Sequence, residues 1–201
     1  MKFAFYSIFH PVNTYEDIKN KGKGSLFFSA LIVAAWFFAA VIERQATNFR
    51  FNHNNARDLN VLLILLRTAV LYGMWVISSW GSCTLLSGKG KLPEIAKMTA
   101  YALIPLIIAI LLKTAASFFL SLNEGIFIWL IMFAGYFWTA LLLFIGHMEA
   151  HHYEIGQAFV TIIVTFIGIL AIIFIVLLIG TIVGQFLGFL RDIAIELLNR
   201  I

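Results

Sequence analysis

The sequence is poor in charged residues. Asp, Glu, Lys and Arg make up 12% of its 201 residues, whereas apolar residues make up 62%. Soluble globular domains average about 25% charged and about 45–50% apolar residues. A soluble fold of this length would have too little charge to cover its surface. The composition therefore excludes an ordinary soluble domain and indicates an integral membrane protein.

Cysteine and glycosylation signals are also scarce. Cys83 is the single cysteine, so neither an intrachain disulfide nor a multi-cysteine metal site can form. No Asn-x-Ser/Thr sequon occurs, and glycosylation therefore does not assign any segment to the cell exterior.

Motifs for catalysis are missing as well. The sequence has no Ser/His/Asp set, no glycine-rich phosphate loop and no pair of Asp residues within an apolar run. We therefore expect a protein without enzymatic activity and without a cofactor. The net charge of +4 does not indicate a nucleic-acid partner, because the basic residues flank apolar runs, where the positive-inside rule accounts for them.

What the sequence does contain is long apolar runs. A spanning helix needs about 20 mostly apolar residues, because each residue advances about 1.5 Å through hydrocarbon about 30 Å thick. We predict an all-α, polytopic membrane helical bundle with a membrane domain over residues 24–181. Its five predicted spans lie at about 25–42, 62–87, 94–113, 125–146 and 155–179.

The two ends of the chain have a different, amphipathic character. Residues 1–23 form a predicted N-terminal amphipathic segment, in which Thr14 and Asp17 resemble a helix cap and predict a short helix over Tyr15–Lys21. The fifth apolar run is too long for one perpendicular span. We therefore predict a tilted span followed by a C-terminal amphipathic helix over 182–201. Its polar residues fall at helical spacing and are Gln185, Asp192, Glu196 and Asn199.

The distribution of Lys and Arg predicts the orientation in the membrane. If the spans alternate, one side receives Lys2, Lys19, Lys21, Lys23, Lys89, Lys91 and Lys97. The other side receives Arg44, Arg50, Arg57, Arg191, Arg200 and Lys113. This distribution predicts a cytoplasmic N-terminus. We expect a multi-pass protein of the plasma membrane.

Two basic residues, Arg67 and Lys113, lie within or beside apolar runs, and no Asp or Glu falls inside a predicted span to pair with them. Our leading interpretation is that both side chains reach the membrane interface, because each lies near the end of its span. The alternative is an intramembrane polar site that lines a pore or binds a substrate. Pro105 lies in the third span and predicts a kink there, because it removes one backbone hydrogen bond.

Gly180, Gly184 and Gly188 form two overlapping Gly-x-x-x-Gly units. Such a stripe lets another helix approach closely. The partner helix could belong to the same chain or to another subunit, and the sequence leaves both alternatives open.

His147 and His151 are four residues apart, which is the spacing of two zinc ligands on one helix face. Met148 stands where a metalloprotease helix has its Glu. We therefore favour a polar connection at the end of the fourth span over a metal site.

Four short segments resemble the Yip family (Ypt/Rab-interacting proteins) in its short bacterial form, over roughly residues 9–180. The segment His10–Ile18 resembles the family's Pro, then Thr and an aromatic residue, then Ile, before the first span. Leu86–Gly90 and Tyr101–Pro105 resemble its second loop and its Pro-containing third span, and His151–Phe159 resembles the polar entry to its last span.

The resemblance implies a five-span helical domain without enzymatic activity and with a cytoplasmic N-terminus. Eukaryotic members bind Rab-type GTPases through a long N-terminal region. Here about two dozen residues precede the first predicted span, so we expect no Rab-type GTPase partner. Some bacterial relatives accompany ABC-type transporters. The resemblance therefore implies a scaffold or accessory subunit whose partners are the lipid bilayer and other membrane proteins, with ABC transporter subunits among the candidates. A small transporter or channel that uses Arg67, Lys113 and the Pro105 kink is the alternative function.

Overall fold

The computed structural model describes residues 2–52, 59–86 and 88–199, and regular secondary structure within these ranges is entirely helical. Five of its helical segments are long and apolar enough to cross a membrane. The predicted membrane helical bundle is therefore confirmed. Arg57, Arg200 and Ile201 lie outside the described residues.

Two short helices open the chain, α1 (Lys2–Phe9) and α2 (Pro11–Asn20). Helix α2 begins four residues earlier than predicted, because Pro11 occupies the first turn, where its fixed φ angle suits a helix. Tyr15 and Ile18 are fully buried in a cluster with residues of α4, α5 and α7. The Lys19 ammonium also meets the Glu94 carboxylate at 2.7 Å, with both side chains nearly buried. The N-terminal segment is therefore part of the core.

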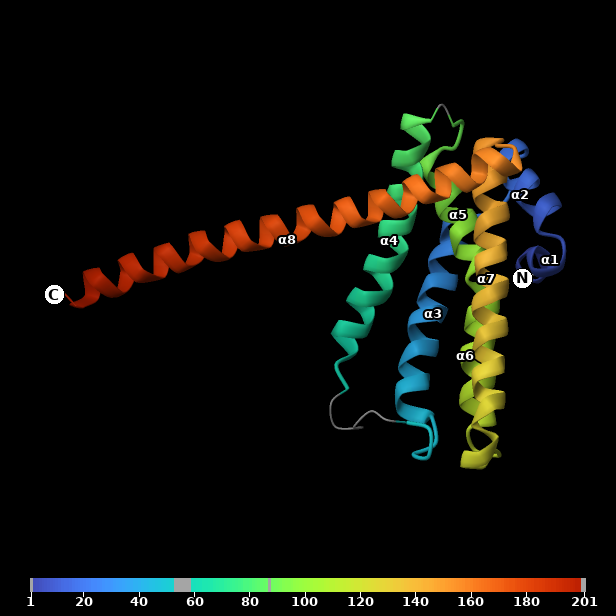
Figure 1. Ribbon diagram of the computed structural model, residues 1–201, viewed down its shortest axis with the longest axis horizontal. Helices are drawn as coiled ribbons and strands as arrows, with labels where there is room; N and C mark the ends of the chain where they lie inside the picture. Colours follow the sequence, from blue (N-terminus) through green and yellow to red (C-terminus); the bar gives the residue numbers. More distant parts are fainter. Residues whose placement is uncertain (1, 53–58, 87, 200–201) are drawn as a thin grey trace.

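Four helices run side by side as a bundle (Figure 1): α3 (Leu26–Ala46), α4 (Val61–Leu85), α6 (Ile104–Ala116) and α7 (Gly125–His151). Polar caps fix where two of them begin. The Ser25 hydroxyl accepts a hydrogen bond from the Phe27 amide, and the Asn60 side chain accepts one from the Leu63 amide. These caps satisfy amides that would otherwise lack partners in a first turn. A short 3₁₀ helix, η2 (Leu122–Glu124), precedes α7.

The third predicted span consists of two helices, α5 (Leu92–Ala102) and α6, which meet at Leu103. Pro105 lies in the first turn of α6, the position where a missing amide hydrogen costs least. The break therefore lies at the position where Pro105 predicts a kink.

The core lies where α5 and α6 pack against α3 and α7. Helices α6 and α7 pack closely at Gly135, where an added Cβ would overlap the Cβ of Ala109. The absence of a side chain at Gly135 therefore sets the distance between these two helices.

Helix α8 (Ile155–Asn199) is a single continuous helix. Its first third packs against α4 and α7, and the remainder leaves the bundle and runs across the direction of the other long helices (Figure 1). From residue 173 to residue 196 every residue except Gly188 is exposed. The amphipathic segment predicted over 182–201 is therefore, as far as residue 199, the continuation of α8 and not a separate element.

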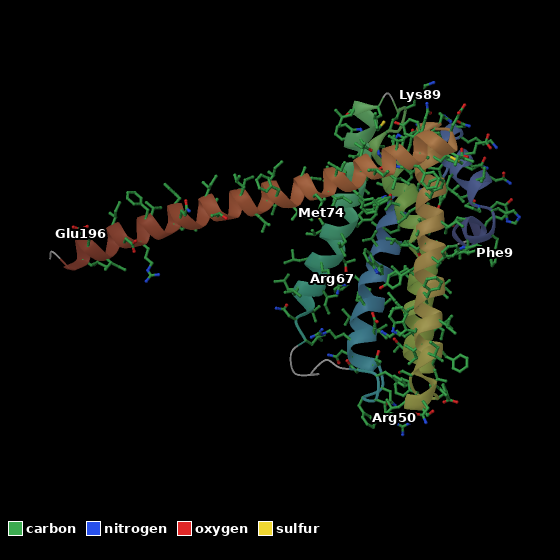
Figure 2. The ribbon with its side chains drawn as sticks, in the orientation of Figure 1. Phe9, Arg50, Arg67, Met74, Lys89 and Glu196 are labelled. Carbon is green, nitrogen blue, oxygen red and sulfur yellow. The ribbon has the colours of Figure 1, made fainter. Side chains whose placement is uncertain are left out.

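For Lys89 and Arg50, the structure agrees with the opposite sides that the span pattern assigns. Figure 2 shows Lys89 at one end and Arg50 at the other. Lys19 donates a hydrogen bond to the carbonyl of Lys89, which brings α2 and the α4–α5 connection together. Because α8 runs across the bundle, it does not turn toward the end where Arg50 lies, and Figure 2 shows Glu196 away from that end.

Candidate functional site: a basic cavity between α3, α4 and α6

A cavity of about 480 Å³ lies between α3, α4 and α6, in the half of the bundle nearer Arg50. Within the described residues, four charged side chains line it: Glu43, Arg44, Arg67 and Lys113. The structure thus brings together both residues of the polar site that the sequence offers as an alternative, Arg67 and Lys113, and adds two charges that the sequence-based interpretation did not include.

Glu43 and Lys113 form an ion pair across the cavity wall, with side chains 28% and 20% exposed. The expectation that no acid pairs with Lys113 is therefore wrong. The predicted first span ends at residue 42, but α3 continues to Ala46 and carries Glu43 to the last turn of α6. Charged residues at a span's end do not terminate a helix, because every backbone hydrogen bond can still be made within it.

Arg67 differs from Lys113 because no hydrogen bond or ion pair joins it to any residue in the described ranges. It lies six residues after the start of α4 at Val61, about 9 Å along the helix. Its side chain is exposed and lines the cavity. Figure 2 places it in the half of α4 that is farther from Lys89.

The rest of the cavity wall is mixed in character. Hydroxyl and amide groups come from Thr47, Asn52, Asn60, Thr68 and Tyr136, and apolar side chains include Trp36, Leu63, Leu71, Leu106 and Ile110. The Thr68 hydroxyl donates to the carbonyl of Ile64, which leaves its oxygen able to accept. Among the described residues, three basic side chains and one acidic side chain line this space, so its described lining is mainly basic.

At the opposite end of the bundle, His147 joins three helices. Its Nδ1 lies 3.0 Å from the Ser79 hydroxyl of α4, and its Nε2 lies 2.9 Å from the Thr161 hydroxyl of α8. The Ser82 hydroxyl similarly lies 2.8 Å from that of Thr165. Hydrogen bonds between helices are a main source of helix association within a membrane. This group of side chains therefore holds the first third of α8 against the bundle.

The hydrogen bonds of His147 bear on whether His147 and His151 can bind a metal ion. The rings of His147 and His151 are in contact, with centroids 4.7 Å apart, but both nitrogens of His147 already have hydroxyl partners. His151 is buried, and its two nitrogens have no partner within the described ranges. Those ranges contain no group of three His, Cys, Asp or Glu residues placed to hold a metal ion.

The glycine stripe has no partner helix in the described part of the chain. At Gly180, Gly184 and Gly188 an added Cβ would meet nothing within 4 Å. Gly168, earlier on α8, is different, because a Cβ there would overlap the Ser78 hydroxyl. Of the two alternatives for the stripe, packing within the same chain is therefore not what this structure contains.

Sequence reasoning missed the hydroxyl residues that contact α8. The signal was present, because Thr161 and Thr165 are four apart in an apolar run, and Ser78 and Ser82 are four apart on α4. Residues at this spacing share a helix face. Polar residues on one face of an apolar helix therefore mark its packed side.

Comparison with known proteins identifies the family. The model of the Yip1 domain matches residues 5–188, nearly the whole chain. The chain belongs to the Yip1 domain family. No curated protein and no solved structure matches it significantly. Because this Yip1 domain covers α2 through most of α8, both the basic cavity and the glycine stripe lie within the family domain.

Proposed function

We propose that this Yip1 domain protein is a non-enzymatic accessory subunit or scaffold that uses α8 to join a complex of membrane proteins. The observation that carries the proposal is the exposure of α8. Only 6% of its most apolar stretch is buried, although an apolar helix in a membrane packs against protein or lipid along its whole length.

The character of the exposed segment favours protein over lipid as the covering. Helices in a membrane associate where small residues let their backbones approach closely. Gly180, Gly184 and Gly188 offer such a face over about two turns. A partner helix from another membrane protein fits this face, and ABC-type transporter subunits are the class that the family resemblance suggests.

The same proposal includes an orientation and a location. The lysine-rich end of the bundle, with Lys19, Lys89 and Lys97, supports a cytoplasmic N-terminus under the positive-inside rule. We place the protein in the plasma membrane and expect its partner to be a membrane protein and not a Rab-type GTPase.

The test is purification in mild detergent through an N-terminal tag, followed by mass spectrometry of the proteins that co-elute. We expect stoichiometric recovery of another membrane protein with the natural chain. Gly184→Leu should lose that partner, because a side chain would fill the stripe. Gly156→Leu is the matched control, since Gly156 also lies on α8 in open space but outside the stripe. Recovery of the natural chain alone would contradict the proposal.

A small transporter or channel is the second candidate, and the basic cavity favours it. Transport proteins often contain a cavity lined by charged residues beside a helix that is interrupted within the membrane. This function requires solute flux from the protein reconstituted alone. Flux that is lost in Arg67→Leu would support transport, and its absence in the natural protein would exclude transport by the isolated chain.

A further inference from the structure

We propose that α1 lies among the lipid acyl chains of the leaflet at the lysine-rich end of the bundle, where Trp138 holds it. The interaction surface is the outer face of α1, and its partner is lipid. This inference is independent of the role of α8. It rests on the depth at which α1 meets the bundle, on the face that α1 exposes, and on the hydrogen bonds at the end of α1.

The contact between α1 and α7 sets the depth of α1. The Trp138 indole donates a hydrogen bond to the Ile8 carbonyl at 3.1 Å. Trp138 is the middle residue of α7 (Gly125–His151), so about 20 Å of helix lies on either side of it. Half of the hydrocarbon core is about 15 Å thick. A spanning α7 therefore places Trp138, and the end of α1 that it contacts, inside the hydrocarbon.

The third span gives a similar depth. Helix α1 contacts α6 as well as α5. Helix α6 begins at Ile104, twelve residues after α5 begins at Leu92, which is about 18 Å farther from the lysine-rich end. Figure 1 shows α1 beside the bundle and farther from that end than α2. Helix α2 then leads the chain back to the lysine-rich end, where Lys19 meets Glu94.

The face that α1 turns away from the bundle is apolar. Ser7 and Ile8 are buried, whereas Tyr6 and Phe9 are 46% and 74% exposed. Residues 3–9 contain no Asp, Glu, Lys, Arg or His. Such a surface is unfavourable in water and favourable against acyl chains. Trp138 is itself 38% exposed, so the outer face of α1 continues the lipid-facing surface of α7.

The break between α1 and α2 suits an environment without water. A backbone carbonyl in hydrocarbon needs a partner within the protein. The Ile8 carbonyl accepts from Trp138, and the His10 carbonyl accepts from both the amide and the hydroxyl of Thr14. Pro11 has no amide hydrogen that would need a partner. These features let the chain change direction within the leaflet.

The experiment is a spin-label depth measurement on the full chain in phosphatidylcholine vesicles. A nitroxide is attached to Phe9→Cys, Phe137→Cys or Lys21→Cys in a Cys83→Ser background. Power saturation compares the collisions of each label with oxygen, which dissolves among acyl chains, and with a water-soluble nickel complex. Phe137 is 57% exposed next to Trp138 and is the control in lipid. The Lys21 side chain is 65% exposed and is the control in water.

We expect the label at position 9 to match the label at position 137, with frequent oxygen collisions and few nickel collisions. Tyr6→Cys provides a second position on the same face and should give the same result. Nickel collisions as frequent as at position 21 would overturn the proposal. Protection from both reagents would show that protein covers this face, and it would also overturn the proposal.

Trp138→Phe tests the hydrogen bond that holds α1. Without the indole N–H the Ile8 carbonyl lacks its partner, so α1 should move toward the interface. Nickel collisions at position 9 should then rise about twofold or more, because one hydrogen bond shifts an equilibrium by at least about that factor. Trp129→Phe is the matched control, since Trp129 also lies exposed on α7, nine residues nearer Gly125. No rise in Trp138→Phe, or an equal rise in both variants, would contradict anchoring by Trp138.

Discussion

The third span and the last helix differ in how much of each is buried in the bundle. In the segment Leu92–Ala116, which contains α5 and α6, the most apolar stretch has a mean hydropathy of 2.2 and is 67% buried. In helix α8 the most apolar stretch has a mean hydropathy of 3.5 and is 6% buried. The more apolar helix is thus the less packed one. Hydropathy decides whether a helix enters the membrane, but it does not decide what the helix packs against, because lipid tails are as apolar as leucine side chains.

The packed helices share small or hydroxyl residues at their contacts. Gly135 of α7 lets α6 approach, and Gly168 of α8 lets α4 approach at Ser78. Beyond this point α8 still carries glycines, at Gly180, Gly184 and Gly188, but no helix lies against them in the described part of the chain. The glycines at the contacts of α6–α7 and α4–α8 therefore help to build the chain's own fold, whereas those of the stripe lie on a surface that no helix of the described part covers.

The largest loss of stability should come from Gly135→Leu. A side chain at this position would collide with Ala109, and forcing extra carbons into a packed contact typically costs about 1–3 kcal/mol or more. We expect a lower thermal unfolding midpoint in detergent and aggregation on size-exclusion chromatography. Gly184→Leu, with open space around it, should leave the midpoint unchanged. Equal destabilisation by the two changes would contradict the conclusion that Gly135 is packed and Gly184 is not.

An intermediate effect should come from the contacts that hold the start of α8. His147→Leu would leave the buried Ser79 hydroxyl without its histidine partner, whereas the Thr161 hydroxyl would keep its hydrogen bonds to the carbonyls of Gln157 and Ala158. A buried polar group left unsatisfied costs about 1–3 kcal/mol. We expect a lower unfolding midpoint and easier proteolysis at the α7–α8 connection.

Thr161→Val provides the check on that explanation. If the two residues act through their hydrogen bond, the double variant should be less destabilised than the sum of the single variants, by about 0.5–3 kcal/mol. Simple additivity would mean that His147 stabilises the bundle by other contacts.

The smallest effect is expected at the surface of α2. Hydrogen bonds from Lys21 and Lys23 lower the pKa of the Asp17 carboxyl below its usual value. Because the folded pKa lies below the unfolded one, the stabilisation is present above the unfolded pKa, about 3.9, and is lost as the pH falls through the folded pKa. Asp17→Asn should lower the unfolding midpoint slightly at pH 7 and not at the acid end of the titration. An effect of equal size at both pH values would exclude the ion pairs as its cause.

Much of the architecture was predictable from sequence, because span length and the Pro105 break follow from backbone geometry. Other features depend on which residues meet in three dimensions. The Glu43–Lys113 pair was missed because a charged residue was taken as the end of a span, although α3 continues past it. The buried role of Tyr15 was missed because an amphipathic segment fits an interface as well as a bundle surface. Periodicity cannot distinguish these two environments.

The most direct test of assembly through α8 is photocross-linking in the native membrane from position 183, beside the glycine stripe. Val183 is 49% exposed. A photoreactive amino acid replaces Val183, and mass spectrometry identifies what it captures. We predict a cross-link to a different membrane polypeptide, and we expect this cross-link to be lost when Gly184→Leu is added. Capture only of α3–α7 of the same chain, of further copies of this protein, or of lipid would contradict an accessory subunit that assembles through α8.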